Sequence, residues 1–175
     1  MRELIPANDI VIVPQQHGQK RWQCDTEGTW DEHRTARDNS FLNISAVRLH
    51  ELPLIRDSRG SLSFAEYEKT LPFLPKRYFI VFDVGEGQTR GGHAHSTVHQ
   101  LLVCVKGSCL VELDDGTARD ELRLDRPELA LYIPPRIWAT QRQFSRDGVL
   151  MVLASEVYDP DEYIKDYDDF LRVAK

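Results

Sequence analysis

The chain has 175 residues and a formal net charge of −6 at pH 7, which is enough chain for the core of one domain and argues against a nucleic-acid-binding surface. Its hydrophobic content of 41% and charged content of 29% are ordinary for a soluble protein. No stretch is apolar enough for a signal peptide or a membrane span, and the three cysteines lack CxxC spacing. We therefore expect a cytoplasmic protein with free thiols, and neither a membrane nor a nucleic acid as its partner.

Residues 1–43 are polar and lack periodicity, apart from one short apolar run at residues 10–13 that ends at Pro14. This pattern predicts an N-terminal extension or a long loop without a core of its own. Whether part of it covers a functional site or a neighbouring subunit stays open.

From Asn43 onward the sequence changes to short strand-like runs. Residues 44–54 and 61–66 are expected strands on either side of a turn at 57–60, DSRG. Residues 77–84 are rich in aromatic and β-branched side chains and predict a strong strand.

Residues 90–107, RGGHAHSTVHQLLVCVKG, carry three histidines at positions 93, 95 and 99, followed by an apolar run at 101–105. Such a run before a glycine predicts a buried strand. Alternate side chains on a strand share a face, so His93 and His95 should point into one space. Two imidazoles in a shared cavity can transfer protons or bind a metal, and the alternative is a pair of structural histidines.

Further strands are expected at residues 108–113, 119–124, 129–133, 140–144 and 149–154, with a hairpin turn at 114–116, DDG. Short strands without intervening helices indicate a sandwich or a barrel. The sequence DPDE at 159–162 predicts a helix start. Tyr163, Ile164, Tyr167, Phe170 and Leu171 then follow helical spacing, and we expect this stripe to pack on the barrel or on a partner subunit.

The frame around the histidines, from Gly87 through His93-Ala94-His95 and Gln100 to Gly107, resembles the first sequence motif of the cupins. This resemblance implies an all-β jelly-roll barrel, the double-stranded β-helix, over residues 44–175, with a short C-terminal helix. Metal-binding cupins have Glu at the position of Gln100 and a further His at the position of Ala139. A tight transition-metal site needs three or four such ligands, so we expect no metal here. A metal-dependent, dioxygenase-like cupin remains an alternative that depends on His93, His95 and His99.

A closer resemblance covers residues 57–170. Its motifs lie in order at 57–62, 90–95, 113–116, 124–127, 131–133, 149–155 and 163–167. This ordered set is similar to that of the dTDP-4-keto-6-deoxyglucose 3,4-ketoisomerases, the WxcM-like small cupins. The resemblance implies a homodimer without cofactor or metal, in which N-terminal strands are commonly exchanged between subunits. It implies an isomerase that moves the carbonyl of a dTDP-linked 4-keto-6-deoxy sugar from C4 to C3, for deoxyamino-sugar and polysaccharide biosynthesis.

Moving a ketone to the next carbon requires removal of an α-proton, an enediol, and return of a proton to the old carbonyl carbon. Histidine titrates near neutrality and can serve as base and then as acid. By similarity, His95 is the expected base and His93 the proton relay. Arg59 and Arg77 are expected substrate contacts, because guanidinium groups donate paired hydrogen bonds to phosphate. Tyr78, His99 and Trp138 complete the predicted substrate-binding set. The alternative for Trp138 is a core aromatic, and the alternative for each arginine is a surface ion pair.

The chain also departs from the family pattern. Two consecutive tyrosines of the family correspond here to Phe79 and Ile80, and a histidine corresponds to Ala139. The hydroxyl nearest to these positions in sequence is that of Tyr78. These losses leave open a third hypothesis, a cupin that binds a nucleotide sugar without turning it over.

Overall fold

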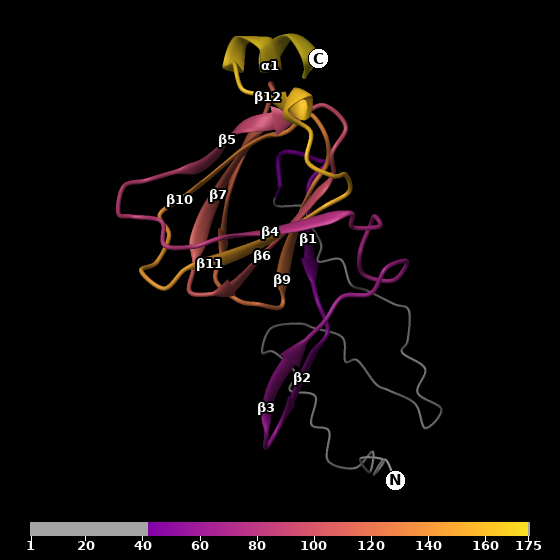
Figure 1. The fold of residues 1–175 in the computed structure, drawn as a ribbon, viewed down its shortest axis with the longest axis vertical. Coiled ribbons are helices and arrows are strands. Elements are labelled where there is room, and N and C mark those ends of the chain that lie inside the picture. Colours follow the sequence, from indigo (N-terminus) through magenta and orange to yellow (C-terminus); the bar gives the residue numbers. More distant parts are fainter. Residues whose placement is uncertain (1–41, 175) are drawn as a thin grey trace.

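The structure is a computed structural model that describes residues 42–174. The predictions for residues 10–13 and for Cys24 lie outside this part. One sheet has the order β1 (Arg48–Glu51), β9 (Leu129–Ile133), β6 (Gln100–Lys106), β11 (Val149–Ala154), β4 (Arg77–Val81). The other has the order β12 (Tyr163–Ile164), β5 (Arg90–His95), β10 (Trp138–Arg142), β7 (Cys109–Asp114), β8 (Arg119–Leu124). Figure 1 shows the two sheets as a jelly-roll-like barrel, which confirms the cupin fold.

The core lies between the two sheets and is built by alternation along their strands. On β11 every second residue is buried, and Val152 belongs to the same apolar cluster as Leu102 of β6 and Val111 of β7. Burial of one such side chain stabilises the fold by about 1.5–3 kcal/mol. Cys104 and Cys109 are fully buried in this core and are free, as expected for these two thiols.

A second apolar cluster covers the outer face of the first sheet. Leu101, Val103 and Ala130 point to this face, and the loop between β3 and β4 packs Leu71 and Phe73 against it. Both faces of β6 are therefore covered near its start, which explains why its sequence is a continuous apolar run and does not alternate.

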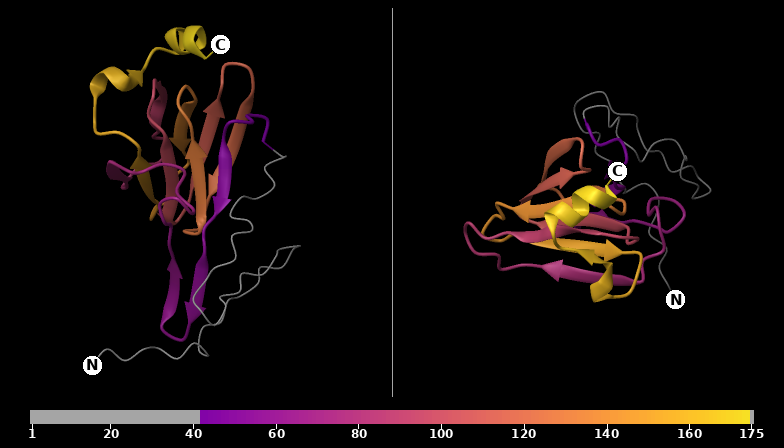
Figure 2. Two further views of the ribbon diagram at one scale, coloured as in Figure 1. Left: turned by 90° about the vertical axis from the view of Figure 1, so that its right-hand side faces the viewer. Right: turned by 90° about the horizontal axis from the view of Figure 1, so that it is seen from above.

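Most strands were predicted closely, and those at 119–124, 129–133 and 149–154 coincide with β8, β9 and β11. The strand expected over residues 44–54 is wrong in its extent, because β1 covers only Arg48–Glu51. Pro53 follows β1 and has no N–H to donate to a ladder. The chain then enters the hairpin of β2 (Leu54–Asp57) and β3 (Gly60–Ser63), which projects beyond the barrel (Figure 1 and, turned by 90°, Figure 2).

The predicted short C-terminal helix is confirmed, but it begins later than expected, because the segment from residue 160 onward is not one continuous helix. Pro160–Glu162 form one 3₁₀ turn capped by the Asp159 side chain. Tyr163 and Ile164 then pair with β5 as the short strand β12. A second cap, Asp166, starts helix α1 (Tyr167–Val173), whose Phe170 is fully buried. No helix in residues 42–174 has the length and apolar character needed to cross a bilayer.

Candidate active site

The site begins with the backbone of β5, which contains a pair of glycines. Gly91 and Gly92 have φ angles of +75° and +70°, values that side-chain-bearing residues rarely adopt. A Cβ atom at Gly91 would lie 2.5 Å from the Ala139 carbonyl oxygen of the neighbouring strand β10. The register between β5 and β10 shifts at this point. Such irregularities re-aim the side chains that follow, here His93 and His95.

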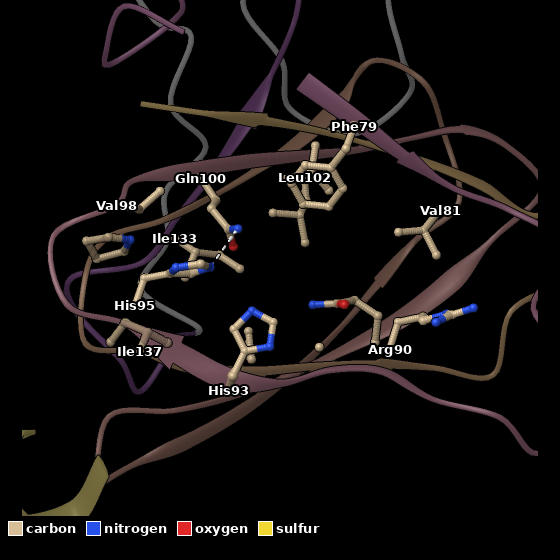
Figure 3. Close-up of a pocket in the computed structure, with 15 residues that line it drawn as sticks. Phe79, Val81, Arg90, His93, His95, Val98, Gln100, Leu102, Ile133 and Ile137 are labelled. Atoms are coloured by element: carbon tan, nitrogen blue, oxygen red, sulfur yellow. Dashed lines mark hydrogen bonds between the residues drawn. The ribbon is translucent and has the colours of Figure 1, made fainter. Parts of the chain in front are cut away.

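Both histidines line a cavity of about 180 Å³ between the two sheets (Figure 3). The polar part of its wall comes from His93, His95, Gln100, Arg90 and Gln141. The remaining wall is largely apolar, formed by Phe79, Val81, Gly91, Val98, Leu102, Ile133, Pro134, Ile137, Ala139 and Val152. The cavity therefore sets two imidazoles against a wall that is largely apolar.

The imidazole pair has a defined geometry. The ring centroids of His93 and His95 lie 4.9 Å apart, with the rings nearly perpendicular at 86°. This proximity confirms that the two histidines share one face. His95 is 5% exposed, and its Nε2 atom lies 3.2 Å from Nε2 of Gln100, so a carboxamide lies beside this imidazole. The Nδ1 atom of His95 is buried and has no hydrogen-bond partner within residues 42–174.

Burial and neighbouring charges hold both imidazoles neutral. Burial lowers the pKa of His95 from 6.5 to about 4, and the proximity of His93 and Arg77 adds to this, while Glu162 opposes it. Burial also lowers the pKa of His93, with a smaller contribution from the Lys165 charge and an opposing hydrogen bond to the Gly91 backbone. Each histidine is therefore ready to accept a proton at neutral pH.

Tyr163 of β12 is a site residue that the sequence analysis missed. Its ring centroid lies 4.5 Å from that of His95 and 4.8 Å from that of His93. The sequence placed Tyr163 on the apolar stripe of a helix, because its spacing to Tyr167 and Phe170 is helical. The signal that could have found it is the second cap, Asp166, which starts the helix later.

Arg77, at the start of β4, lies near the histidines as its charge effect on His95 shows. Its guanidinium carbon lies 5.5 Å from the ring centroids of both Phe79 and Tyr158. Its Nε atom is buried without a hydrogen-bond partner among the described residues. The arrangement leaves a guanidinium group stacked on aromatic rings and with a donor free to bind an anion.

Arg77 and the other predicted substrate contacts are not among the residues that line the cavity. Tyr78 is 68% exposed, because Phe79 and Val81 are the residues of β4 that face inward. Trp138 of β10 packs on Tyr167 and Phe170, on the face opposite to the inward-facing Ala139.

His99 and Arg59 are also placed elsewhere. The Nδ1 atom of His99 lies 2.7 Å from the Tyr132 hydroxyl, and the two rings stack at 13°. Arg59 lies in the turn of the projecting hairpin and pairs with Asp57 at 2.5 Å. Neither residue therefore reaches the histidine pair within its own chain.

The residues of the cavity do not form a metal-ligand set. Within residues 42–174, no group of three or more His, Cys, Asp or Glu side chains is arranged to hold a metal ion. His99 turns toward Tyr132, and Ala139 occupies the position where metal-binding cupins have a further histidine. Within residues 42–174, a metal at His93 and His95 would find no third His, Cys, Asp or Glu ligand, and the carboxamide of Gln100 is the polar side chain beside His95.

Comparison with known proteins agrees with this geometry. The model of the family described as FdtA, WxcM-like, C-terminal matches residues 45–175. A TDP-4-oxo-6-deoxy-α-D-glucose-3,4-oxoisomerase of Aneurinibacillus thermoaerophilus is 48% identical over 116 residues, which cover 66% of this chain and 84% of that protein.

Solved structures extend the similarity to the whole barrel. The TDP-quinovose 3,4-ketoisomerase WlaRB of Campylobacter jejuni has 41% identity and a TM-score of 0.71, over 74% of this chain and 99% of that one. QdtA, a sugar 3,4-ketoisomerase of Thermoanaerobacterium thermosaccharolyticum crystallised with TDP, has 35% identity and a TM-score of 0.73, over 75% and 96%.

Proposed function

This chain belongs to the FdtA, WxcM-like family, and from that membership we propose that it is a TDP-sugar 3,4-ketoisomerase. The reaction moves the carbonyl of a TDP-linked 4-keto-6-deoxyhexose from C4 to C3, as a step of deoxyamino-sugar biosynthesis. The observation that carries the proposal is the pair of neutral imidazoles on one wall of a cavity. Relatives named for this reaction support the choice of substrate.

His95 is the proposed base that removes the proton from C3. Its imidazole is neutral at pH 7, because burial lowers its pKa to about 4. The enediolate that forms next to it is negatively charged, and an opposite charge raises the pKa of an imidazole. The cavity thus keeps His95 ready before the reaction and favours its protonated form once the enediolate exists.

His93 is the proposed relay that helps to return the proton to C4. C3 and C4 are adjacent atoms, and the two imidazoles are neighbours at 4.9 Å between ring centroids. A pair of bases on one wall can therefore serve both carbons without moving the sugar. General acid–base groups of this kind contribute about a hundred- to ten-thousand-fold to rate.

Arg77 is the proposed contact to the diphosphate. Its stacked guanidinium has an unused buried donor, and bidentate binding of phosphate is the usual role of such a group.

We further propose that the functional unit is a homodimer in which the β2–β3 hairpin reaches a second copy of the chain. The hairpin projects beyond its own barrel and carries the exposed Leu62 as well as Arg59 (Figure 2). Tyr78, Ile80 and Phe82 add further exposed apolar surface on and beside the edge strand β4. Large apolar groups of this kind on a surface favour a protein partner.

Mixing two variants tests the dimer and the role of Arg59 together. If Arg59 serves the cavity of the partner, a His95→Asn subunit and an Arg59→Ala subunit form a mixed dimer with one intact site. Two inactive preparations should then regain part of the activity after mixing and subunit exchange. Monomers in light-scattering measurements, or no recovery in mixed dimers, would contradict this arrangement.

The reaction itself is tested with TDP-4-keto-6-deoxyglucose in deuterated water, with a 3-aminotransferase to trap the product. The intact chain should yield a 3-amino sugar and exchange deuterium at C3. His95→Asn should lose both activities, whereas His93→Asn should slow turnover but keep some exchange, since the first proton can still leave. Loss of exchange in His93→Asn alone would reverse the two roles. Binding without exchange or product in the intact chain would identify a non-catalytic sugar-binding protein.

A further inference from the structure

Strand β12 places an aromatic ring against the proposed catalytic pair. It pairs with the edge of β5 so that Tyr163 lies opposite His95 and Ile164 opposite Ala94. Directly opposite residues of an antiparallel pair project to the same face of the sheet. Tyr163 therefore lies on the face that carries both histidines, although it comes from the C-terminal segment.

The three rings form a closed cluster. Their centroid distances are 4.5 Å for Tyr163 and His95, 4.8 Å for Tyr163 and His93, and 4.9 Å for the two histidines. Tyr163 does not line the cavity, so it contacts the imidazoles from the sheet edge. One side chain is thus in a position to limit the rotation of both imidazoles and to cover a part of each that the cavity wall leaves open.

Tyr163 is itself held in place. The residue before it, Glu162, accepts hydrogen bonds on its carboxylate from the Thr97 backbone N–H at 2.9 Å and the Thr97 hydroxyl at 3.0 Å. The Glu162 carbonyl accepts a further bond from the Ser96 backbone N–H at 3.0 Å. The ammonium group of Lys165 lies 5.7 Å from the Tyr163 ring centroid. These contacts fix β12 to the loop that directly follows His95.

We propose that Tyr163 is a positioning residue that holds the imidazoles of His93 and His95 in their productive arrangement and keeps water away from them. The proposal rests on the proposed ketoisomerase function only for its consequences on turnover. The contribution belongs to the ring and not to the hydroxyl, because the Tyr163 ring lies tilted against both imidazoles with centroid distances of 4.5 and 4.8 Å. Phenylalanine at position 163 should therefore preserve the positioning of the imidazoles, whereas a small residue should not.

Removal of the ring changes the environment of two titrating groups. His95 faces the charges or potential charges of His93 on β5, Arg77 on β4 and Glu162 before β12, while His93 also faces Lys165. Alanine at position 163 leaves these groups in place but admits water to the imidazoles. Because burial is the largest cause that lowers each pKa, hydration should raise both values toward 6.5.

The test compares Tyr163→Ala, Tyr163→Leu and Tyr163→Phe with the intact chain. NMR titration of the imidazole signals should show the pKa of His95 raised by about one unit or more in Tyr163→Ala and unchanged in Tyr163→Phe. The acidic limb of kcat/KM should move upward in the same variant. The value of kcat should fall about a hundredfold, as expected for a displaced catalytic group. Tyr67→Ala, a substitution in the loop between β3 and β4, is the matched control and should change neither titration.

Each outcome decides the proposal. Unchanged imidazole titrations in folded Tyr163→Ala, or in Tyr163→Leu if the alanine variant does not fold, would overturn it. A loss of activity in Tyr163→Phe as large as in Tyr163→Ala would assign the role to the hydroxyl and overturn it as well. The titrations need no substrate, so they separate a failure of this proposal from a failure of the proposed reaction.

Discussion

The buried state of His95 makes a prediction about stability that needs no substrate. In the unfolded chain its imidazole titrates near 6.5, whereas in the fold burial lowers the pKa to about 4. Between these values the unfolded state binds more protons than the native state, so the free energy of unfolding falls as the pH falls. The stability contributed by the neutral form is present above pH 6.5 and is lost progressively toward pH 4.

The magnitude follows from linkage. With a pKa near 6.5 in the unfolded state and about 4 in the fold, the loss between pH 7 and pH 5 is about 2 kcal/mol, and about 3 kcal/mol at pH 4. Carboxylates and the other histidines also titrate in this range, so the matched measurement is the difference between the intact chain and His95→Asn. Urea unfolding at equal protein concentration, followed by tryptophan fluorescence, supplies this difference at each pH.

We expect His95→Asn to differ from the intact chain by a constant packing penalty plus a term that shifts in its favour by about 2 kcal/mol from pH 7 to pH 5. A difference that stays constant with pH would show that His95 titrates normally in the fold. It would also remove the argument that the cavity keeps this imidazole neutral by burial.

Three further predictions concern the frame of the site. Gly91→Ala should destabilise the fold by at least about 1 kcal/mol, because its φ of +75° is strained for alanine and the new Cβ meets the Ala139 carbonyl at 2.5 Å; Gly87→Ala, at φ +74° but with open space around the new Cβ, gives the milder comparison in thermal unfolding. Leu131→Ala should cost about 2–5 kcal/mol in urea unfolding, because Leu131 is fully buried in the core. Asp114→Asn should weaken the attachment of α1, since the carboxylate accepts hydrogen bonds from the Tyr167 hydroxyl at 2.6 Å and Arg119 at 2.7 Å; faster amide hydrogen exchange confined to α1 would confirm it, and unchanged exchange would contradict it.

The strands of the barrel could be predicted because the patterns that mark them lie within short stretches of sequence. Alternating or continuous apolar runs bounded by Gly and Asp marked most strands, and the HAH spacing placed both histidines on one face. The C-terminal segment was harder, since Tyr163 has a spacing to Tyr167 that fits a helix as well as the observed strand and helix. Only pairing of β12 with the free edge of β5 decides between them, and pairing between distant segments is not a local property.

The second limit of prediction from the sequence was the choice of which face of each strand lines the cavity. Alternation says that Tyr78 and Phe79 lie on opposite faces, but it does not say which face is inside. The structure puts Phe79 in the cavity wall and leaves Tyr78 68% exposed. On β10, Ala139 lines the cavity and Trp138 does not. Arg59 shows a further limit, because the spacing of its neighbours predicts a turn but does not say that the hairpin projects beyond its own barrel (Figure 1).

The apolar wall of the cavity links the chemistry of the site to its sensitivity to acid. Phe79, Leu102 and Val152 of the first sheet line the same cavity as the imidazoles of the second sheet and give them no hydrogen bonds. Burial lowers the pKa of both imidazoles and disfavours their protonated forms, so both bases start neutral. In the proposed reaction, an imidazole that starts neutral can take the proton from C3. The burial that keeps the imidazoles neutral also makes the free energy of unfolding fall when the pH falls. A variant that raises the pKa of His95 toward 6.5 should therefore also lose less stability at low pH.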